Sequence, residues 1–288
     1  MALYIVKIPI FFLVLLKGPM PRKHSRVRSK KSKKTTKKKS TRRSANSKIR
    51  GGGVFSSAVG FLTPKLTDAT IRRAVKDYLG DGARKKLVVV KYGDISHWDV
   101  SNVTDMSSLF ENAGTKRTTS FNQPLNNWNV SNVTNMESMF SSARSFNQPL
   151  NNWNVSKVTD MRWMFADAEA FNQPLNNWNV SSVTNMTDMF ALAESFNQPL
   201  NNWDVSNVEY MAGMFNRATS FNQPLNNWDV SKVTSMESMF WGATSFNQPL
   251  NNWDVSKVTY MEEMFEEATS FNQPLHAPWY AVEQSDSE

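Results

Sequence analysis

Apolar and polar residues follow a period of 25 residues through most of the chain. The words FNQPLNNW begin at Phe121 and return every 25 residues, and a shortened copy starts at Phe271. A fixed period of this size is typical of repeat proteins, in which each period is one structural unit. The pattern inside one period therefore predicts the fold of the whole repeat region.

Within one unit, the spacing of apolar residues changes from that of a strand to that of a helix. In residues 121–145, Trp128 and Val130 lie two positions apart, as on one face of a strand. Thr134 and Glu137 then match the capping box that begins many helices. The next apolar residues have helical spacing: Met136, Met139, Phe140 and Ala143. The proline of NQP ends this run and turns the chain, so each unit is predicted to be a strand, a turn and a short helix.

A single unit cannot bury its own apolar residues, so neighbouring units are expected to stack. We expect residues 94–275 to form a curved α/β solenoid, a leucine-rich-repeat-like stack of 25-residue strand-turn-helix units with a parallel β ladder. Its seven strand lines would lie at Trp98, Trp128, Trp153, Trp178, Trp203, Trp228 and Trp253. We assign these tryptophans, and the paired methionines, to the core rather than to a ligand site.

The segment before the repeats, residues 64–93, is predicted to be an N-terminal cap. Thr67 occupies the N-cap position of a helix, and Gly80 would end it. The apolar stripe of this helix comprises Ile71, Ala74, Val75, Tyr78 and Leu79. The β-branched run in KKLVVVKYGDIS then predicts a short strand. This helix-strand cap would close the first unit of the stack.

One strand face carries polar residues that recur in every unit. Its middle position forms a candidate ladder along the stack: Asn129, Asn154, Asn179, Asp204, Asp229 and Asp254. Asparagine side chains can form hydrogen bonds from unit to unit, which is a structural role. The three successive carboxylates would repel one another. Either a bound cation or the nearby Lys232 and Lys257 would offset that repulsion.

A second candidate surface lies on the outer helical face, where residues differ between the copies. Its aromatic members are Trp163, Tyr210, Trp241 and Tyr260. Aromatic side chains are common anchors of protein interfaces, so this face is the candidate partner-binding surface. The alternative is sequence drift on a solvated surface. The near-constant strand face favours either recent duplication or a repetitive ligand such as a glycan.

These words also carry a family resemblance. The stretch YGDISHWDVSNVTDMSSLF, followed by FNQPLNNWNVSNVTNMESMF and its copies, resembles the BspA-like leucine-rich-repeat surface proteins. It is most similar to the branch with W-[DN]-V-S-x-V-T-x-M-x-x-M-F repeats, which occurs in mycoplasmas, other bacteria and large DNA viruses. The resemblance covers about residues 68–275. It implies a leucine-rich-repeat-type solenoid and a surface, adhesion or host-interaction role.

Charge is distributed very unevenly along the chain. Residues 1–50 carry 17 Lys and Arg and no Asp or Glu, whereas the remaining residues carry 16 basic and 25 acidic side chains. Residues 20–53 are predicted to be a disordered tail that ends in a glycine hinge. Its candidate polyanion-binding residues are Lys30, Lys31, Lys33, Lys34, Lys37, Lys38, Lys39, Arg42 and Arg43. Such a tail would bind nucleic acid or an anionic surface without sequence preference, and the alternatives are a solvated tail or a nuclear-import signal.

The two ends of the chain leave interpretations open. Residues 1–19 are hydrophobic and would be a signal or anchor, although Lys7 and Pro9 interrupt them. Alternatively, translation starts at Met20 and this segment is not made. The first interpretation favours a secreted or cell-surface protein, and the second an intracellular, nuclear or virion-associated one. Residues 276–288 are expected to form a short C-terminal cap or tail.

The sequence contains no arrangement typical of catalysis. It has no cysteine, and its three histidines, His24, His97 and His276, lack metal-ligand spacing. Every Asp and Ser of the repeat recurs by translation, whereas catalysis requires one asymmetric set of groups. We therefore expect no enzyme activity, no catalytic or cofactor-binding residues, no metal, no cofactor and no small-molecule substrate.

The favoured hypothesis is a non-enzymatic protein-interaction module of the surface or adhesion type, with a protein partner of unknown identity. An alternative is an intracellular or virion-associated scaffold whose basic tail binds nucleic acid or another polyanion. A third possibility is a structural array that associates with itself.

Overall fold

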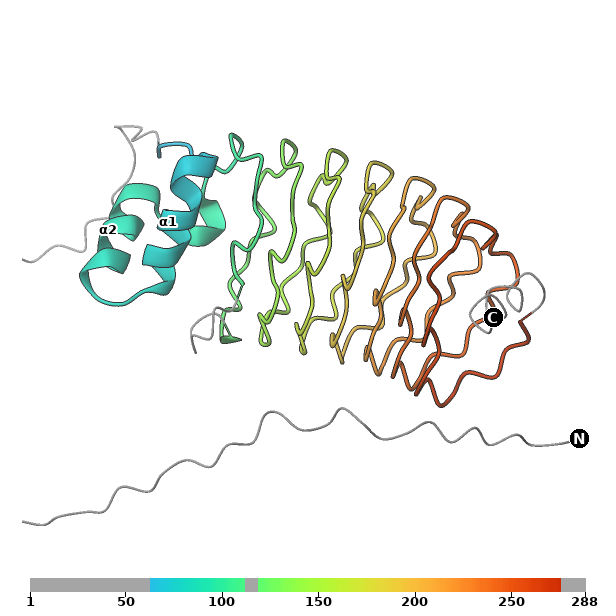
Figure 1. The fold of residues 1–288 in the computed structure, drawn as a ribbon. Coiled ribbons are helices and arrows are strands. Elements are labelled where there is room, and N and C mark those ends of the chain that lie inside the picture. Colours follow the sequence, from blue (N-terminus) through green and yellow to red (C-terminus); the bar gives the residue numbers. More distant parts are fainter. Residues whose placement is uncertain (1–62, 112–118, 276–288) are drawn as a thin grey trace, which may run out of the picture. The chain divides into compact units, whose positions relative to one another are not determined.

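The computed structural model of the protein describes residues 63–111 and 119–275. Two helices, α1 (Asp68–Leu79) and α2 (Ala83–Tyr92), come first, followed by the short 3₁₀ helix η1 (Ile95–His97). The repeats then follow one another as coils, which lie side by side in chain order (Figure 1). The segments predicted from sequence as a hydrophobic segment (1–19), a basic tail (20–53) and a C-terminal cap or tail (276–288) lie outside the described residues.

Helix α1 forms as its sequence predicts. Thr67 precedes it with an extended backbone, and the backbone N–H of Thr67 donates to Thr70 Oγ1 at 2.9 Å. This contact pairs a donor that would otherwise lack a partner at the start of the helix. The predicted apolar stripe faces inward, because Ile71, Ala74, Val75 and Tyr78 are buried.

The strand predicted after α1 is wrong, because these residues form helix α2. Val88 and Tyr92 lie four positions apart, so one helical face brings both into the core. The Tyr92 ring lies 5.9 Å from that of Trp98, and Tyr78 of α1 lies 5.5 Å from the same tryptophan. Burial of these aromatic rings between the helices and the first coil outweighs the strand preference of the Val88–Val90 run. The cap is therefore a pair of helices.

The repeat units contain neither the strand nor the helix that the sequence predicts. Within the described coils, the only extended pairing is one isolated parallel bridge between each coil and the next, such as Asn135 with Asp160. The predicted strand at Trp128 and Val130 and the predicted helix from Met136 to Ala143 are both wrong in conformation. Both segments consist of turns and irregular backbone. We call residues 135–142, and the corresponding residues of each coil, the ladder segment.

Hydrogen bonds between coils explain why the ladder segment is not a helix. Every second N–H of the segment donates to a carbonyl of the next coil. The N–H groups of Met139 and Ser141 instead close turns within the coil by donating three residues back, as from Met139 to Met136 (3.2 Å). Positive φ angles at Ser138 and Ser142, of 54° and 55°, turn alternate peptide groups towards the neighbouring coil. The bonds between coils run from Met136 N to Asp160 O (3.0 Å), Ser138 N to Arg162 O (2.9 Å), Phe140 N to Met164 O (2.9 Å) and Ser142 N to Ala166 O (2.7 Å).

The tryptophans lie in the core, as predicted, and they also link the coils. Trp153 is 2 % exposed, and its ring stacks on that of Trp178 with centroids 6.4 Å apart. Its indole Nε1 donates to the carbonyl of Leu125 in the preceding coil at 3.0 Å. The same bond recurs from Trp178, Trp203, Trp228 and Trp253. Each buried N–H therefore has a partner, and each coil is tied to the one before it.

Phenylalanines form two further columns through the stack. Phe140 lies 4.2 Å from Phe146, the first residue of the following unit, and 5.5 Å from Phe165, its counterpart one period later. Phe146 lies 6.1 Å from Phe171. Ring planes in these columns are within a few degrees of parallel, so equal residues repeat almost by translation. Stacking of like on like explains why these positions do not vary between copies.

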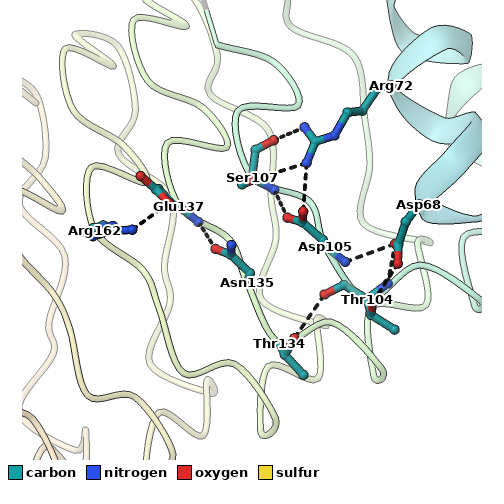
Figure 2. A network of polar contacts seen from close by, with 9 residues as sticks. All are labelled: Asp68, Arg72, Thr104, Asp105, Ser107, Thr134, Asn135, Glu137 and Arg162. Atoms are coloured by element: carbon teal, nitrogen blue, oxygen red, sulfur yellow. Dashed lines mark hydrogen bonds and ion pairs between the residues drawn. The ribbon is translucent and has the colours of Figure 1, made fainter.

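Helix α1 provides the hydrogen bonds that a preceding coil would give to the first coil. In later coils, Thr159 donates its backbone N–H to the carbonyl of Thr134 at 2.9 Å and its hydroxyl to the same oxygen at 3.3 Å. At the first coil, Asp68 takes over this role (Figure 2). Thr104 donates its N–H to Asp68 Oδ1 at 2.8 Å and its hydroxyl to Oδ2 at 2.7 Å.

Arg72, one helical turn after Asp68, provides the complementary donors. In later coils, the carbonyl of Arg162 accepts the N–H of Ser138 from the coil before. The corresponding carbonyl in the first coil belongs to Ser107, and the Arg72 guanidinium donates to it. The same guanidinium bonds Ser107 Oγ at 2.9 Å and Asp105 Oδ2 at 3.1 Å (Figure 2). Two side chains of α1 thus substitute for the backbone of a missing coil.

Coils joined by parallel bridges and by hydrogen bonds to the residue one period away form a regular stack within residues 94–275. The more specific expectation, a curved α/β solenoid of the leucine-rich-repeat class, stays a prediction.

Protonation of Asp68 is predicted to loosen the cap. Burial disfavours its charged form, but the hydrogen bonds from Thr104 and Asp105 and the charge of Arg72 together lower its pKa. A carboxyl with a lowered folded-state pKa stabilises the fold above its unfolded pKa, and this contribution is lost as the pH falls through the folded value. Hydrogen exchange of α1 should therefore accelerate below about pH 4.

The substitution Asp68→Asn should produce the same loosening at neutral pH, with a loss of about 1–2 kcal/mol in the stability of α1. Asp77→Asn is the matched control. Asp77 pairs with the exposed Arg73 on α1 at 2.7 Å, and an i,i+4 pair on a helix contributes only about 0.3–0.5 kcal/mol. Equal effects of the two substitutions on α1 exchange would contradict the capping role of Asp68.

Candidate interaction surface

Large apolar side chains are exposed along the ladder segments of successive coils. Trp163 is 39 % exposed, Leu192 37 %, Tyr210 45 % and Tyr260 58 %. We call these four residues the outer ladder surface. They come from four different coils, yet all lie between the bridge position and the end of the ladder segment.

The predicted partner-binding residues are therefore brought onto one continuous element, which is a ladder rather than a helix. Tyr210 and Tyr260 occupy bridge positions: Tyr210 pairs with Asn185 on one side and Ser235 on the other. Trp241 is less exposed than the others, because the Arg217 guanidinium covers its ring at 4.2 Å. Leu192 was missed from sequence, since a single leucine at a variable position gave no aromatic signal.

Trp163 is held by a contact to the next coil and by a contact to the residue before it. Its indole Nε1 donates to Asp188 Oδ2 of the next coil at 3.0 Å, and the Arg162 guanidinium lies 5.6 Å from its ring. Its backbone has a φ of 55°, in the left-handed region. These contacts fix the orientation of the ring and leave part of it facing solvent.

Asp188 is half-buried between Trp163 and the backbone of the following coil. Desolvation raises the pKa of its carboxyl, although the indole hydrogen bond of Trp163 acts in the opposite direction. The next coil has Gly213 at the equivalent position, and a β-carbon there would lie 2.0 Å from Asp188 Oδ1. The glycine therefore makes room for the carboxylate, which in turn positions the tryptophan.

Charged side chains also join neighbouring coils on this side of the stack. Arg162 bonds Glu137 of the preceding coil at 2.9 Å (Figure 2) and lies 3.3 Å from Asp160 of its own coil. Arg144 pairs with Asp167 and Glu169 of the next coil at 3.0 and 2.8 Å. These exposed pairs contribute little to stability individually, but they order the surface around Trp163.

The predicted ladder of Asn129, Asn154, Asn179, Asp204, Asp229 and Asp254 is wrong in its hydrogen bonding. Each side-chain oxygen accepts the backbone N–H two residues later in its own coil, as from Ser131 to Asn129 (3.2 Å) and from Ser256 to Asp254 (3.0 Å). Asn and Asp favour such local turns, which compete with bonding between coils. Among the described residues, no hydrogen bond joins successive members of this set.

The carboxylates of this set are stabilised locally. Hydrogen bonds from the Ser231 hydroxyl and N–H lower the pKa of Asp229, with a smaller contribution from the charge of Lys232; the charge of Asp254 acts in the opposite direction. The hydroxyl and N–H of Ser256 similarly lower the pKa of Asp254. Lys232 itself bonds Asn207 of the preceding coil at 2.7 Å.

A different asparagine column joins the coils, and it was missed from sequence. Asn122 Oδ1 accepts the N–H of Asn147 and the Nε2 of Gln148, both at 3.0 Å. The arrangement continues through Asn172, Asn197, Asn222 and Asn247. The sequence signal for this column was the constant Asn-Gln pair before each proline. A turn alone does not require both residues, so their constancy indicated a further contact.

The structure does not describe the predicted polyanion-binding residues. The basic residues Lys30 to Arg43 lie outside the described residues. Within residues 63–111 and 119–275, no three His, Asp or Glu side chains gather as metal ligands would, and no helix has the length and apolar character that crossing a bilayer requires.

A family model matches most of the repeat region. It is described as "Mycoplasma protein of unknown function, DUF285", and it matches residues 84–203 and 174–279, together more than half of the chain. The chain belongs to this family. The chain itself has no significant match among the curated proteins or the solved structures.

Gly213→Ala is predicted to destabilise the stack by about 1–3 kcal/mol, because its methyl group would overlap the Asp188 carboxylate. The positive φ of 61° contributes less, since Ser138 and Ser238 hold φ angles of 54° and 51° at the equivalent position. Denaturant unfolding would measure the loss. Adding Asp188→Ser should recover most of it.

Gly242→Ala is the matched control for this prediction. It also has a positive φ, of 64°, but the nearest atom to its new methyl group would be Arg217 Cγ at 3.1 Å, on a flexible side chain. The loss of stability caused by Gly242→Ala should therefore be smaller than that caused by Gly213→Ala. Failure of Asp188→Ser to rescue Gly213→Ala would show that the two residues are not coupled.

Proposed function

We propose that this member of the DUF285 family is a non-enzymatic repeat protein that binds another protein through the outer ladder surface. In this proposal the coils form a solenoid of the BspA-like leucine-rich-repeat type. The role is adhesion or interaction with a host at a cell surface, as the resemblance of the repeats implies.

The observation that carries the proposal is the division between constant and variable positions. The constant Trp, Val, Met and Phe residues are buried and build the columns of the stack. At the bridge position, by contrast, the residue changes from coil to coil while the pairing of the backbone does not. Its occupants are Asp105, Asn135, Asp160, Asn185, Tyr210, Ser235 and Tyr260. A constant backbone whose side chains vary, and which exposes Tyr210 and Tyr260, is suited to recognition.

The exposed residues also have the chemistry of interface anchors. Tyrosine and tryptophan bury a large area for few rotatable bonds, and they dominate the energetics of many interfaces. Because the ladder segment is bonded to a coil on each side, Tyr210 and Trp163 sit on backbone that is already ordered. Binding would then cost little additional backbone entropy.

The absence of enzyme activity is part of the proposal. The polar residues of the constant words serve the stack itself, in turns and columns, and they recur with the period.

A photoreactive side chain at Tyr210 should identify the partner. Benzoylphenylalanine introduced at position 210 is expected to cross-link a specific surface protein when the protein is added to candidate host cells. Position 202 is the matched control, because Asn202 is exposed in the same coil but lies outside its ladder segment, eight residues before Tyr210.

Alanine at both Tyr210 and Tyr260 should weaken the affinity for the cross-linked partner on the order of a thousandfold, since hot-spot side chains contribute about 2 kcal/mol or more each, or about 4 kcal/mol together. Binding would be measured by surface plasmon resonance. Equal cross-linking from positions 202 and 210, or an unchanged affinity of the alanine variant, would refute the assignment of this surface.

A second candidate function rests on the charge of the N-terminal residues. The 17 basic and no acidic side chains in residues 1–50 favour an intracellular or virion-associated scaffold that binds nucleic acid or another polyanion. Lys30 to Arg43 would supply most of the contacts.

The affinity for duplex DNA should then fall about a thousandfold or more between about 50 and about 200 mM salt, as expected if about six phosphates are contacted. Fluorescence anisotropy at several salt concentrations would measure it. Deleting residues 20–50 should abolish the binding, and an unchanged affinity at low salt would exclude this function for the tail.

A further inference from the structure

Helix α2 carries the most exposed apolar side chains among the described residues. Val90 is 85 % exposed and Leu87 is 68 % exposed, and Val89 is also exposed. Val88 and Tyr92, on the opposite side of the helix, are buried against α1 and the first coil. With 3.6 residues per turn, Lys86, Leu87 and Val90 therefore form one outward face.

This face is bordered by basic residues. Arg84, Lys85, Lys86 and Lys91 all belong to α2, which contains no acidic residue. Lys85 and Lys91 lie over the rings of Tyr78 and Tyr92, at 4.6 and 4.8 Å, so these two ammonium groups are held against aromatic rings of the cap. None of these four residues forms an ion pair within the described part of the chain.

Among the described residues, an excess of basic over acidic side chains occurs only in the cap. Residues 63–92 contain eight Lys and Arg and three Asp and Glu, whereas the described residues from 93 onward contain six and 19. A basic helical end thus joins an acidic stack within a single compact unit. Any polyanionic surface would attract the helices and repel the coils.

We propose that α2 docks on the surface of an anionic lipid bilayer, with Leu87 and Val90 entering the boundary between headgroups and acyl chains. Lys86, Arg84 and Lys91 lie beside them and would bind lipid phosphates and carboxylates. This is the chemistry of interfacial amphipathic helices, which combine apolar burial with attraction to anionic lipid. The inference does not depend on the function proposed for the outer ladder surface.

Other occupants fit this face less well. Nucleic acid would engage the lysines but would leave Leu87 and Val90 against phosphates and water. Pairing of α2 with the same helix of a second copy would place four basic residues opposite four more, without intervening acids. A bilayer satisfies both the charge and the apolar area.

The length of the helix defines the binding mode. Its ten residues extend about 15 Å, whereas crossing the hydrocarbon core requires about 20 apolar residues. Helix α2 would therefore lie along the surface. Repulsion of the acidic coils would orient the stack away from the bilayer, which leaves the outer ladder surface accessible.

The absence of cysteine from the chain allows a site-specific test. An environment-sensitive fluorophore is attached to a single cysteine in the full-length protein, at Val90→Cys or, as the control, at Leu192→Cys on the stack. Vesicles of phosphatidylcholine, with or without phosphatidylserine, are then added. We expect a blue shift of the probe at position 90 with phosphatidylserine vesicles only, and no shift at position 192.

Adding Leu87→Asp to the Val90→Cys protein should abolish the blue shift, because a carboxylate would face the anionic surface. Lys157→Gln is the matched control for a change of one negative unit in net charge, since Lys157 lies on the stack and bonds Asn132 at 2.8 Å; it should leave the shift intact. Circular dichroism would verify that each variant is folded.

Three results would overturn the proposal. If the protein sediments with the vesicles while the probe at position 90 is unchanged, another part of the chain binds them. A shift at position 90 that appears with rising protein concentration alone would indicate a second copy as the occupant. A shift produced by duplex DNA but not by vesicles would indicate nucleic acid.

Discussion

The structure depends on one repeated interaction, the hydrogen bond from a ladder-segment N–H to a carbonyl one period further along the chain. Met136, Ser138, Phe140 and Ser142 all donate in the same direction, towards the coil that follows. A coil is therefore incomplete by itself, since half of the hydrogen-bonding capacity of this segment lies in its neighbours. The columns of tryptophan and phenylalanine follow from this registration, because equal residues are brought over one another.

Because these hydrogen bonds all point towards the following coil, the two ends of the stack are chemically different. The first coil presents carbonyls that lack a preceding coil, and its Thr104 lacks the acceptor available to later threonines. Helix α1 resolves both deficits with Arg72 and Asp68. These side chains are four residues apart on the helix, so one short element reproduces the hydrogen bonds of a coil with a different backbone. Helix α1 can therefore complete the first coil although its backbone does not resemble that of a coil.

The sequence predicts burial far better than it predicts conformation. Trp128, Met136 and Phe140 were placed in the core correctly, because the period alone determines which residues can meet. The i, i+3, i+4 spacing indicated a helix, yet consecutive turns place side chains on the same face. The deciding hydrogen bonds join residues 24 positions apart, such as Ser138 and Arg162, and local preference carries no information about them.

The polar positions show the same limitation. Asn129 was expected to bond between coils but closes its own turn, whereas Asn122, which looked like part of a loop, forms the column. Both asparagines repeat with the same period, so repetition could not distinguish them. In α2, likewise, three consecutive valines favoured a strand, and only packing of Val88 and Tyr92 against the first coil decided for a helix. The exposure of Tyr210 and Trp163 was predictable, but their support by neighbouring coils was not.

The common direction of the ladder bonds has an electrical consequence. Aligned peptide groups sum to a dipole, as they do in a helix, with its positive pole where the N–H groups point and its negative pole at the carbonyls. The acidic residues Glu262, Glu263, Glu266 and Glu267 gather in the ladder segment of the last described coil, towards the positive pole. Arg72 lies at the negative pole, followed by the basic helix α2. The charge sequence along the chain thus matches the field that the backbone itself creates.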